Sequence, residues 1–509
     1  MSASRERKKR MQQANEPAPA APKKKKKKLS EGWIFAITIV LVVALVFSVL
    51  MIQLNQKRSK TVLTVGGHDV SVKEFNYFYN TTVNTLSSYA SYVGIDTSVG
   101  LDKQYVTSDG AMYLGLFGID SSYLEDKELT DGTYNVTWAQ LIADAAKSSA
   151  VSTYVLYNAA MDAGFEVTEE IESEIEAGMD VMQGYADTNG ESLNSLIRRV
   201  FGSGCNAKGY RQYLTVNYVA EHYGSELTYS AEEISARYNE SPEDYDVATY
   251  YLYTISGSSM VEPAEDGTTP EVTDEDTAKA KQAAEEMEAN FNVDDENVSV
   301  RADNTRASVT SLVSEDAATW LFDEAQPGDV KMFAKEDTTF YVFKLIDKED
   351  YQTVNIMELV IEADHEHEEG EEVDHEHDEN ELTAAEKLEA VETALAADSS
   401  LENFKSLIAE YSSEEDGEVK GMTRSTMSGV SPEILDWFLE DRTVGDYKVF
   451  DVNGTTLVLY FTGYGDNYST KAVNATLVNE WAENAIAEAT EACGYSEENA
   501  MLGNVSIYG

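Results

Sequence analysis

Cysteine is almost absent from this chain of 509 residues, which contains only Cys205 and Cys493. Two thiols cannot supply the set of cross-links that small secreted domains use in place of a large core. The fold must therefore rest on packed cores, and the roughly 450 residues after the first 60 suggest about three domains. One bridge between the two cysteines remains open, provided that both lie outside the reducing cytoplasm.

Basic residues are scarce after residue 60. The first 60 residues carry 14 lysines and arginines and 3 acids, whereas residues 61–509 carry 24 basic and 89 acidic residues. Such an acidic surface repels nucleic acid and phosphorylated ligands, and it attracts cations and basic segments of other chains. We therefore expect no nucleic-acid partner.

The motifs of several enzyme classes are also missing. The sequence contains no Gly-x-Ser-x-Gly and no His-Glu-x-x-His, so a hydrolase lacks support. Residues 204–209 begin and end with glycine, as a phosphate loop does, but Tyr210 and Arg211 stand where lysine and serine or threonine are required. We interpret this segment as a connection between two helices.

One long uncharged segment is present, from Trp33 to Gln53. Its length matches a hydrocarbon core of about 30 Å, which predicts a transmembrane helix at residues 32–54. Eleven lysines and arginines precede this segment. The positive-inside rule therefore predicts a basic cytoplasmic tail at residues 1–31 and an extracytoplasmic remainder anchored in the plasma membrane. A cleaved signal peptide is disfavoured, because its apolar part is usually about 7–15 residues long.

Residues 61–240 are predicted to be mainly helical. Ser71 and Glu74 have the spacing of a capping box at the start of a helix, just after two short strands around a Gly66-Gly67 turn. Helical spacing of apolar residues also runs from Trp138 to Ala163 and stops at Gly164. From Tyr245 the apolar residues alternate as in a strand, so we expect an α+β region to follow.

An internal repeat lies in this α+β region. Trp320 and the pair Gly328-Asp329 recur as Trp437 and Gly445-Asp446, and both are offset by 117 residues. A helix precedes each tryptophan and a strand follows each Gly-Asp pair. We therefore predict two tandem copies of one small α+β domain, at residues 245–349 and 350–465.

The second copy resembles the parvulin class of peptidyl-prolyl isomerases, through Phe404 to Ser412, Gly417 to Met422 and the tryptophan and Gly-Asp positions. The helical region, through Phe165 to Ile171 and Glu232 to Tyr238, is similar to the N-terminal chaperone domain of SurA-like and PrsA-like extracytoplasmic foldases. The resemblance implies a protein that receives newly secreted, unfolded chains, shields them and accelerates proline isomerisation. It requires no cofactor.

The resemblance carries over to individual residues only in part. It places the substrate pocket at Met427, Ile434 and Phe438, and the catalytic positions at Glu414, Met357 and Thr456. The family's two histidines are missing from both copies. Isomerisation breaks no covalent bond and needs only an apolar pocket that eases rotation over a barrier of about 18–20 kcal/mol. Weak activity therefore stays open, beside the alternative that the pocket residues are ordinary core.

A His-rich segment separates the first strand of the second copy from the helix that follows. It contains His365, His367, His375 and His377 among many acids. Imidazoles and carboxylates at this density can chelate Zn²⁺ or another divalent ion, so weak metal binding is one interpretation. A solvated acidic loop is the other.

These patterns predict a membrane-anchored extracytoplasmic folding factor. Two alternatives remain: a non-enzymatic interaction or scaffold protein at the secretion site or cell wall, and a cation-binding surface protein that uses the His-rich loop. By the same resemblance, a C-terminal helix within residues 466–509 should return to the chaperone domain. That return would bring Cys493 towards Cys205 and allow the bridge.

Overall fold

The computed structural model describes residues 56–117, 119, 121–261, 271–363, 382–413 and 417–501. The predicted cytoplasmic tail and transmembrane helix, Glu414 and the four loop histidines lie outside these residues. Among the described helices, none combines the length and apolarity needed to cross a membrane. The described chain is α+β, as expected.

The chain forms two compact units. Unit 1 comprises residues 1–225 and 484–509, and unit 2 comprises residues 226–483. Helix α9 (Ala231–Glu240) belongs to unit 2. There Ile234 of α9 packs with Tyr245 and Val473 in a small core.

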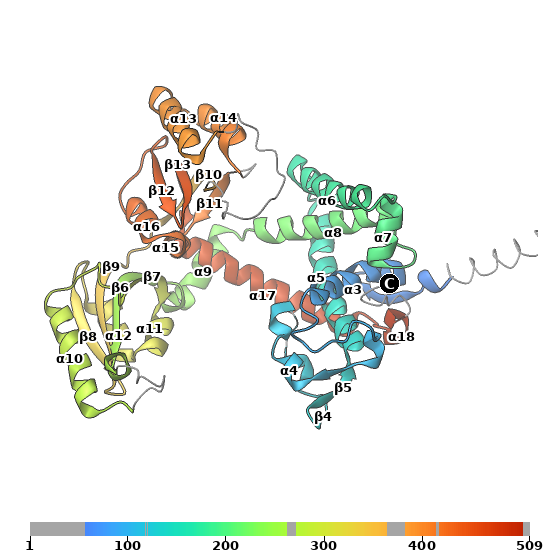
Figure 1. Ribbon diagram of the computed structural model, residues 1–509, viewed down its shortest axis with the longest axis horizontal. Helices are drawn as coiled ribbons and strands as arrows, with labels where there is room; N and C mark the ends of the chain where they lie inside the picture. Colours follow the sequence, from blue (N-terminus) through green and yellow to red (C-terminus); the bar gives the residue numbers. More distant parts are fainter. Residues whose placement is uncertain are drawn as a thin grey trace, which may run out of the picture. The chain divides into compact units, whose positions relative to one another are not determined.

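Unit 1 begins with the strands β1 (Thr61–Val65) and β2 (His68–Ser71), an antiparallel hairpin. Helix α3 (Val72–Ser87) follows and starts with the predicted capping box, in which Glu74 accepts hydrogen bonds from Ser71. Its apolar face packs against the long helix α5 (Trp138–Ala163) (Figure 1). Gly164 adopts the left-handed conformation, with φ of 75°, and ends α5 where the sequence predicted.

The segment between α3 and α5 contains a small sheet that the sequence did not reveal. The strands β3 (Tyr105–Thr107), β5 (Thr133–Thr137) and β4 (Leu129–Thr130) pair in that order. Short helical elements lie around them: η1 (Leu101–Lys103), α4 (Ser108–Ala111), η2 (Leu114–Phe117) and η3 (Ser121–Leu124).

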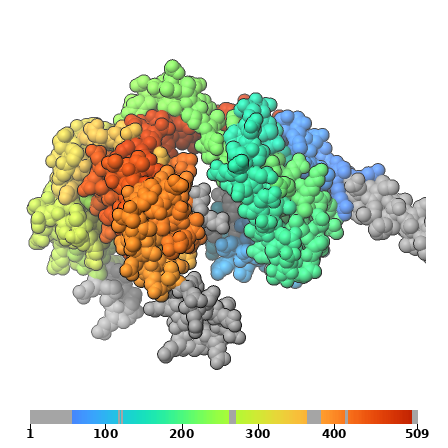
Figure 2. Space-filling view, turned by 90° about the horizontal axis from the view of Figure 1, so that it is seen from above, coloured from blue at the N-terminus to red at the C-terminus, as the bar shows by residue number. Residues whose placement is uncertain are grey.

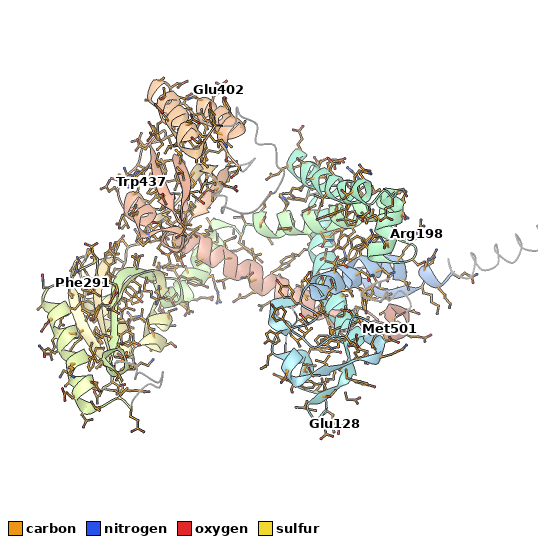
Figure 3. All side chains as sticks on the ribbon, in the orientation of Figure 1. Glu128, Arg198, Phe291, Glu402, Trp437 and Met501 are labelled. Atoms are coloured by element: carbon orange, nitrogen blue, oxygen red, sulfur yellow. The ribbon has the colours of Figure 1, made fainter. Side chains whose placement is uncertain are left out.

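Three more helices complete the N-terminal part of unit 1: α6 (Glu169–Thr188), α7 (Leu193–Phe201) and α8 (Ala207–Glu226). Residues 202–206 join α7 to α8, so the predicted helix connection covers only the first half of the glycine-flanked segment, and residues 207–209 begin α8. Arg198 marks α7 in Figure 3.

The C-terminal segment completes the core of unit 1. Helix α17 (Tyr468–Ala492) begins in unit 2, and its residues from 484 onward belong to unit 1 with the short helix α18 (Glu497–Ala500). Cys493 and Ala500 are buried in the same core as α3 and α5. Backbone hydrogen bonds join Thr64 to Cys493 and Val62 to Ser496. The chain from residue 484 therefore packs on unit 1, with the β1 strand as a partner, whereas the part of the predicted helix before residue 484 belongs to unit 2.

The bridge that the sequence left open is absent, because Cys205 and Cys493 are both free. They lie in different cores of unit 1: Cys205 packs with Phe201 and Tyr77, and Cys493 packs in the main core. The Cys205 thiol donates to the carbonyl oxygens of Lys73 and Phe201, whereas the Cys493 thiol donates to that of Thr490.

Unit 2 contains two copies of one sheet. In copy one, the strands β6 (Val247–Ser256), β7 (Val298–Thr305), β8 (Val330–Lys335) and β9 (Thr339–Asp347) form an antiparallel sheet of order β7-β6-β9-β8. In copy two, β10 (Gln352–Ile361), β11 (Glu418–Met422), β12 (Tyr447–Val452) and β13 (Thr455–Asn467) have the equivalent order β11-β10-β13-β12.

Hydrogen bonds repeat at the predicted offset of 117 residues. Asp329 accepts from the backbone of Gln326 at 2.9 Å, and Asp446 accepts from that of Thr443 at 2.8 Å. In each copy, the Gly-Asp pair also bonds to the backbone of the last strand. The matching strand order and turn confirm that the two copies share one fold.

Helices cover both faces of each sheet (Figure 1). Copy one has α10 (Asp274–Ala289) on one face and α11 (Arg306–Leu312), α12 (Glu315–Thr319) and η6 (Trp320–Glu324) on the other. Copy two has α13 (Ala384–Ala397) and α14 (Leu401–Tyr411), orange in Figure 2, opposite α15 (Arg424–Val430) and α16 (Pro432–Phe438). The short helical turns η4 (Pro242–Asp244) and η5 (Gly257–Met260) flank β6.

Candidate functional site

The site predicted in copy two is divided between the two faces of its sheet. Met427, Ile434 and Phe438 lie together in the core beneath α15 and α16. Met357 lies in the other core, beneath α13 and α14. Thr456 alternates along β13 with Val458 and therefore faces the same side as Met357. Of the predicted catalytic positions that the structure describes, Met357 and Thr456 therefore do not meet the predicted pocket.

Burial favours the interpretation of the pocket residues as core. Met427 and Ile434 are each 1 % exposed, so both belong to the packed core of copy two. Phe438 is half-buried and packs its ring against Trp437, at 4.5 Å between ring centroids. Trp437 marks this end of copy two in Figure 3.

Unit 1 contains a cavity of about 260 Å³ that the sequence did not reveal. The start of α3, the middle of α5, the α7–α8 connection and the first turns of α8 contribute its walls. The lining residues are up to 143 positions apart in the sequence, from Lys73 to Val216. Its position depends on how three helices pack, which no local pattern encodes.

The floor of this cavity is aromatic. It is formed by Tyr77 and Phe78 of α3, Tyr154 of α5 and Tyr213 of α8. The rings of Tyr77 and Tyr213 stack at 5.4 Å, and Phe78 meets Tyr213 edge-on at 5.1 Å. Pairs of this kind contribute about 0.5–1.5 kcal/mol beyond their buried area, so they brace the helices and also offer apolar ring surface to a ligand.

Tyr77 holds the α7–α8 connection in place. Its hydroxyl donates to the carbonyl oxygen of Asn206 at 3.0 Å and accepts from the backbone N–H of the same residue at 3.1 Å. Burial raises the pKa of Tyr77 far above its ordinary value, so the phenol keeps the proton that it donates. Gly209 passes so close that an added Cβ would lie 2.6 Å from this hydroxyl. A side chain at position 209 would therefore displace the ring.

The rim of the cavity is polar and contains two lysines. Lys73 and Lys208 are exposed and line the cavity, as does Gln212. Neither lysine side chain forms a hydrogen bond or an ion pair with a residue that the structure describes. Glu74 also lines the cavity, but its carboxylate accepts from Ser71 and lies 3.5 Å from Nε2 of His68.

In comparisons with known proteins, no protein-family model and no curated protein matches this chain. The site must therefore be interpreted from its geometry alone.

The geometry of the cavity suits binding rather than covalent catalysis. Its walls combine four aromatic rings with amide and ammonium groups, which is the usual composition of a pocket that recognises a side chain. The part of the chain that the structure describes holds no cluster of histidine, cysteine or acidic side chains suited to a metal ion. The proposed metal ligands of the His-rich loop lie outside that part.

A sequence signal for this cavity existed but was ambiguous. Residues 75–79 read Phe-Asn-Tyr-Phe-Tyr, an unusual density of aromatic residues in one helix. Such a run is more often core than a binding site, and most of it is buried here. Only the partners on α5 and α8 turn it into the floor of a cavity.

Proposed function

We propose that this protein binds unfolded polypeptides and that the cavity of unit 1 anchors their side chains. The aromatic floor is the observation that carries the proposal, because ring surface grips many apolar side chains without demanding one sequence. The floor is formed before any client arrives, so little ordering entropy is lost on binding.

The proposal places this activity outside the membrane, with the chain anchored by the predicted transmembrane helix. The basic tail before residue 33 and the acidic remainder support that orientation. An acidic surface also keeps the protein soluble while it holds an aggregating client.

The two copies in unit 2 serve in this proposal as an additional binding surface and not as a catalytic centre. The burial of Met427 and Ile434 supports this view, as does the separation of Met357 and Thr456 from them. A non-enzymatic interaction protein is therefore the second candidate. Weak prolyl isomerisation by copy two remains a prediction.

An aggregation assay on the full-length chain in mild detergent tests the proposal. Gln212 is exposed at the rim, so Gln212→Trp places a large ring over the opening without changing the core. We expect this variant to lose most of the delay in aggregation of an unfolded client. Gln183→Trp, an identical change at an exposed position of α6, is the control.

Equal protection by the two variants and the unchanged protein would refute the assignment of the cavity. An absence of protection in the unchanged protein would refute the function itself. Circular dichroism of each variant separates blocked binding from a misfolded chain.

A further inference from the structure

Two lysines without a carboxylate partner among the described residues lie at the mouth of the aromatic cavity, in a part of the chain where residues 61–509 carry 89 acidic and 24 basic residues. Some other cations of unit 1 are paired, as Arg211 is with Glu172 and Glu176 and Arg199 is with Glu191, whereas Lys103 and Arg198 likewise form no ion pair with a described residue. Lys73 and Lys208 form no such pair with any described residue.

The one acid beside them is already occupied. Glu74 caps the start of α3 by accepting from the backbone N–H of Ser71 at 2.9 Å and from its hydroxyl at 2.5 Å. Its second oxygen faces His68 at 3.5 Å. The Glu74 carboxylate therefore has its partners within unit 1, and the ammonium groups of Lys73 and Lys208 are left to bind an external anion.

The volume of the cavity sets the size of the apolar group that it can hold. A cavity of about 150 Å³ suffices for benzene. At about 260 Å³, this cavity has room for one aromatic side chain and part of the backbone that carries it. The lysines lie at the rim, where that backbone would leave the cavity.

We propose, on the basis of the client-binding function above, that the cavity selects an aromatic residue with a carboxylate directly beside it. The ring contacts the floor formed by Tyr77, Phe78, Tyr154 and Tyr213, and the carboxylate lies between Lys73 and Lys208. Either the C-terminal carboxylate of a client or the side chain of a neighbouring aspartate or glutamate supplies this chemistry. Client segments with several consecutive acidic residues are excluded as ligands of the cavity, because the protein's overall negative charge repels them.

Titration calorimetry with the full-length chain in mild detergent tests this selectivity. Three short peptides with acetylated N-termini and otherwise uncharged residues serve as ligands: one that ends in phenylalanine with a free carboxylate, the same peptide as an amide, and an amidated peptide with an internal Phe-Glu pair. We expect the free acid or the Phe-Glu peptide to bind about ten-fold more tightly than the plain amide. Comparison of the first and third identifies the source of the carboxylate.

Substitution of the rim assigns the effect to the two lysines. Lys73→Gln and Lys208→Gln should each weaken binding of the carboxylate peptide about three-fold, which is the effect of losing one exposed ion pair. Binding of the plain amide should not change. Lys103→Gln removes an exposed lysine elsewhere in unit 1 and should change neither.

Equal binding of acid and amide, or tighter binding of a peptide with arginine beside phenylalanine, would overturn this inference. If Gln212→Trp then abolished both interactions equally, the client-binding function would stand without the carboxylate selectivity. Failure of every peptide to bind, together with no delay in aggregation, would overturn both proposals.

Discussion

The return of the C-terminal segment to unit 1 can be tested by cutting the chain at two points. A chain that ends at Glu483 keeps all of unit 2 and loses residues 484–509 of unit 1. A chain that ends at Met501 loses only residues beyond those that the structure describes, and it is the matched control. The two truncations differ by the segment that packs against β1, α3 and α5.

The contacts of this segment set the magnitude of the effect. It makes three hydrogen bonds to β1: Thr64 N–H to Cys493 O at 2.7 Å, Ser496 N–H to Val62 O at 2.8 Å, and Asn499 Nδ2 to Thr61 O at 2.8 Å. Such bonds contribute about 1 kcal/mol each. Six apolar side chains add roughly 5 kcal/mol by partial or full burial: Ile486, Ala489, Cys493, Tyr495, Ala500 and Met501.

The entropy lost when the segment becomes ordered offsets part of this gross gain of about 8 kcal/mol. We expect a net loss of about 4 kcal/mol when the segment is removed. For a unit of this size, that loss lowers the midpoint of thermal unfolding by about 12 °C. Unit 2 should keep its own transition and thus serve as an internal reference.

Calorimetry and hydrogen exchange measured by mass spectrometry provide the assay. In the chain that ends at Glu483, amides of α3 and α5 should exchange faster than in the chain that ends at Met501. Amides of β10 and β13 in unit 2 should exchange alike in both. If α3 and α5 are equally protected in the two truncations, the segment does not stabilise unit 1 and the reasoning fails.

Three further predictions follow from single residues. Asp303, at φ of 54°, links the two copies by accepting hydrogen bonds from the hydroxyl of Tyr351 at 2.9 Å and from the N–H of Ser425 at 2.7 Å. Asp303→Ala should therefore destabilise unit 2 by about 2 kcal/mol in urea unfolding, and an unchanged midpoint would contradict this link. Burial raises the pKa of Cys205 to about 12, so its thiol should stay protonated at pH 8 in the native protein. Iodoacetamide should therefore modify it only after denaturation. Rapid labelling of the native protein would show instead that the thiol is accessible. In a prolyl-isomerase assay, Phe438→Ala should lower any activity of copy two more than Leu321→Ala in copy one, and equal effects would assign Phe438 to the core alone.

Local sequence signals predicted the helix ends well. The Ser71 cap and the Gly164 stop act through hydrogen bonds and backbone conformation within one turn, so they can be recognised from a few neighbouring residues. The duplication was visible because Trp320 and Trp437 occupy equivalent positions. These features depend on short stretches of sequence or on comparison of one stretch with another.

Features that depend on distant segments were missed or misplaced. The β3–β5 sheet has strands of two to five residues, too short for their alternation to show against a segment rich in serine, tyrosine and glycine. The placement of α9 in unit 2 also depends on a distant segment, because Ile234 of α9 packs with Val473, more than 200 residues further along the chain. The bridge that the sequence left open does not form for a related reason: the two cysteines share a unit but lie in different cores.

The layout of the chain links the stability of unit 1 to the binding site. The cavity is lined only by residues between Lys73 and Val216, so the C-terminal segment contributes nothing to its surface. That segment nevertheless packs on α3 and α5, which carry Tyr77, Phe78 and Tyr154 of the floor. Because an aromatic floor binds well only while its rings are held in place, removal of the segment should weaken client binding without removing any group that touches the client. The packing of the C-terminal segment on α3 and α5 is thus required for tight binding at a site that the N-terminal helices form.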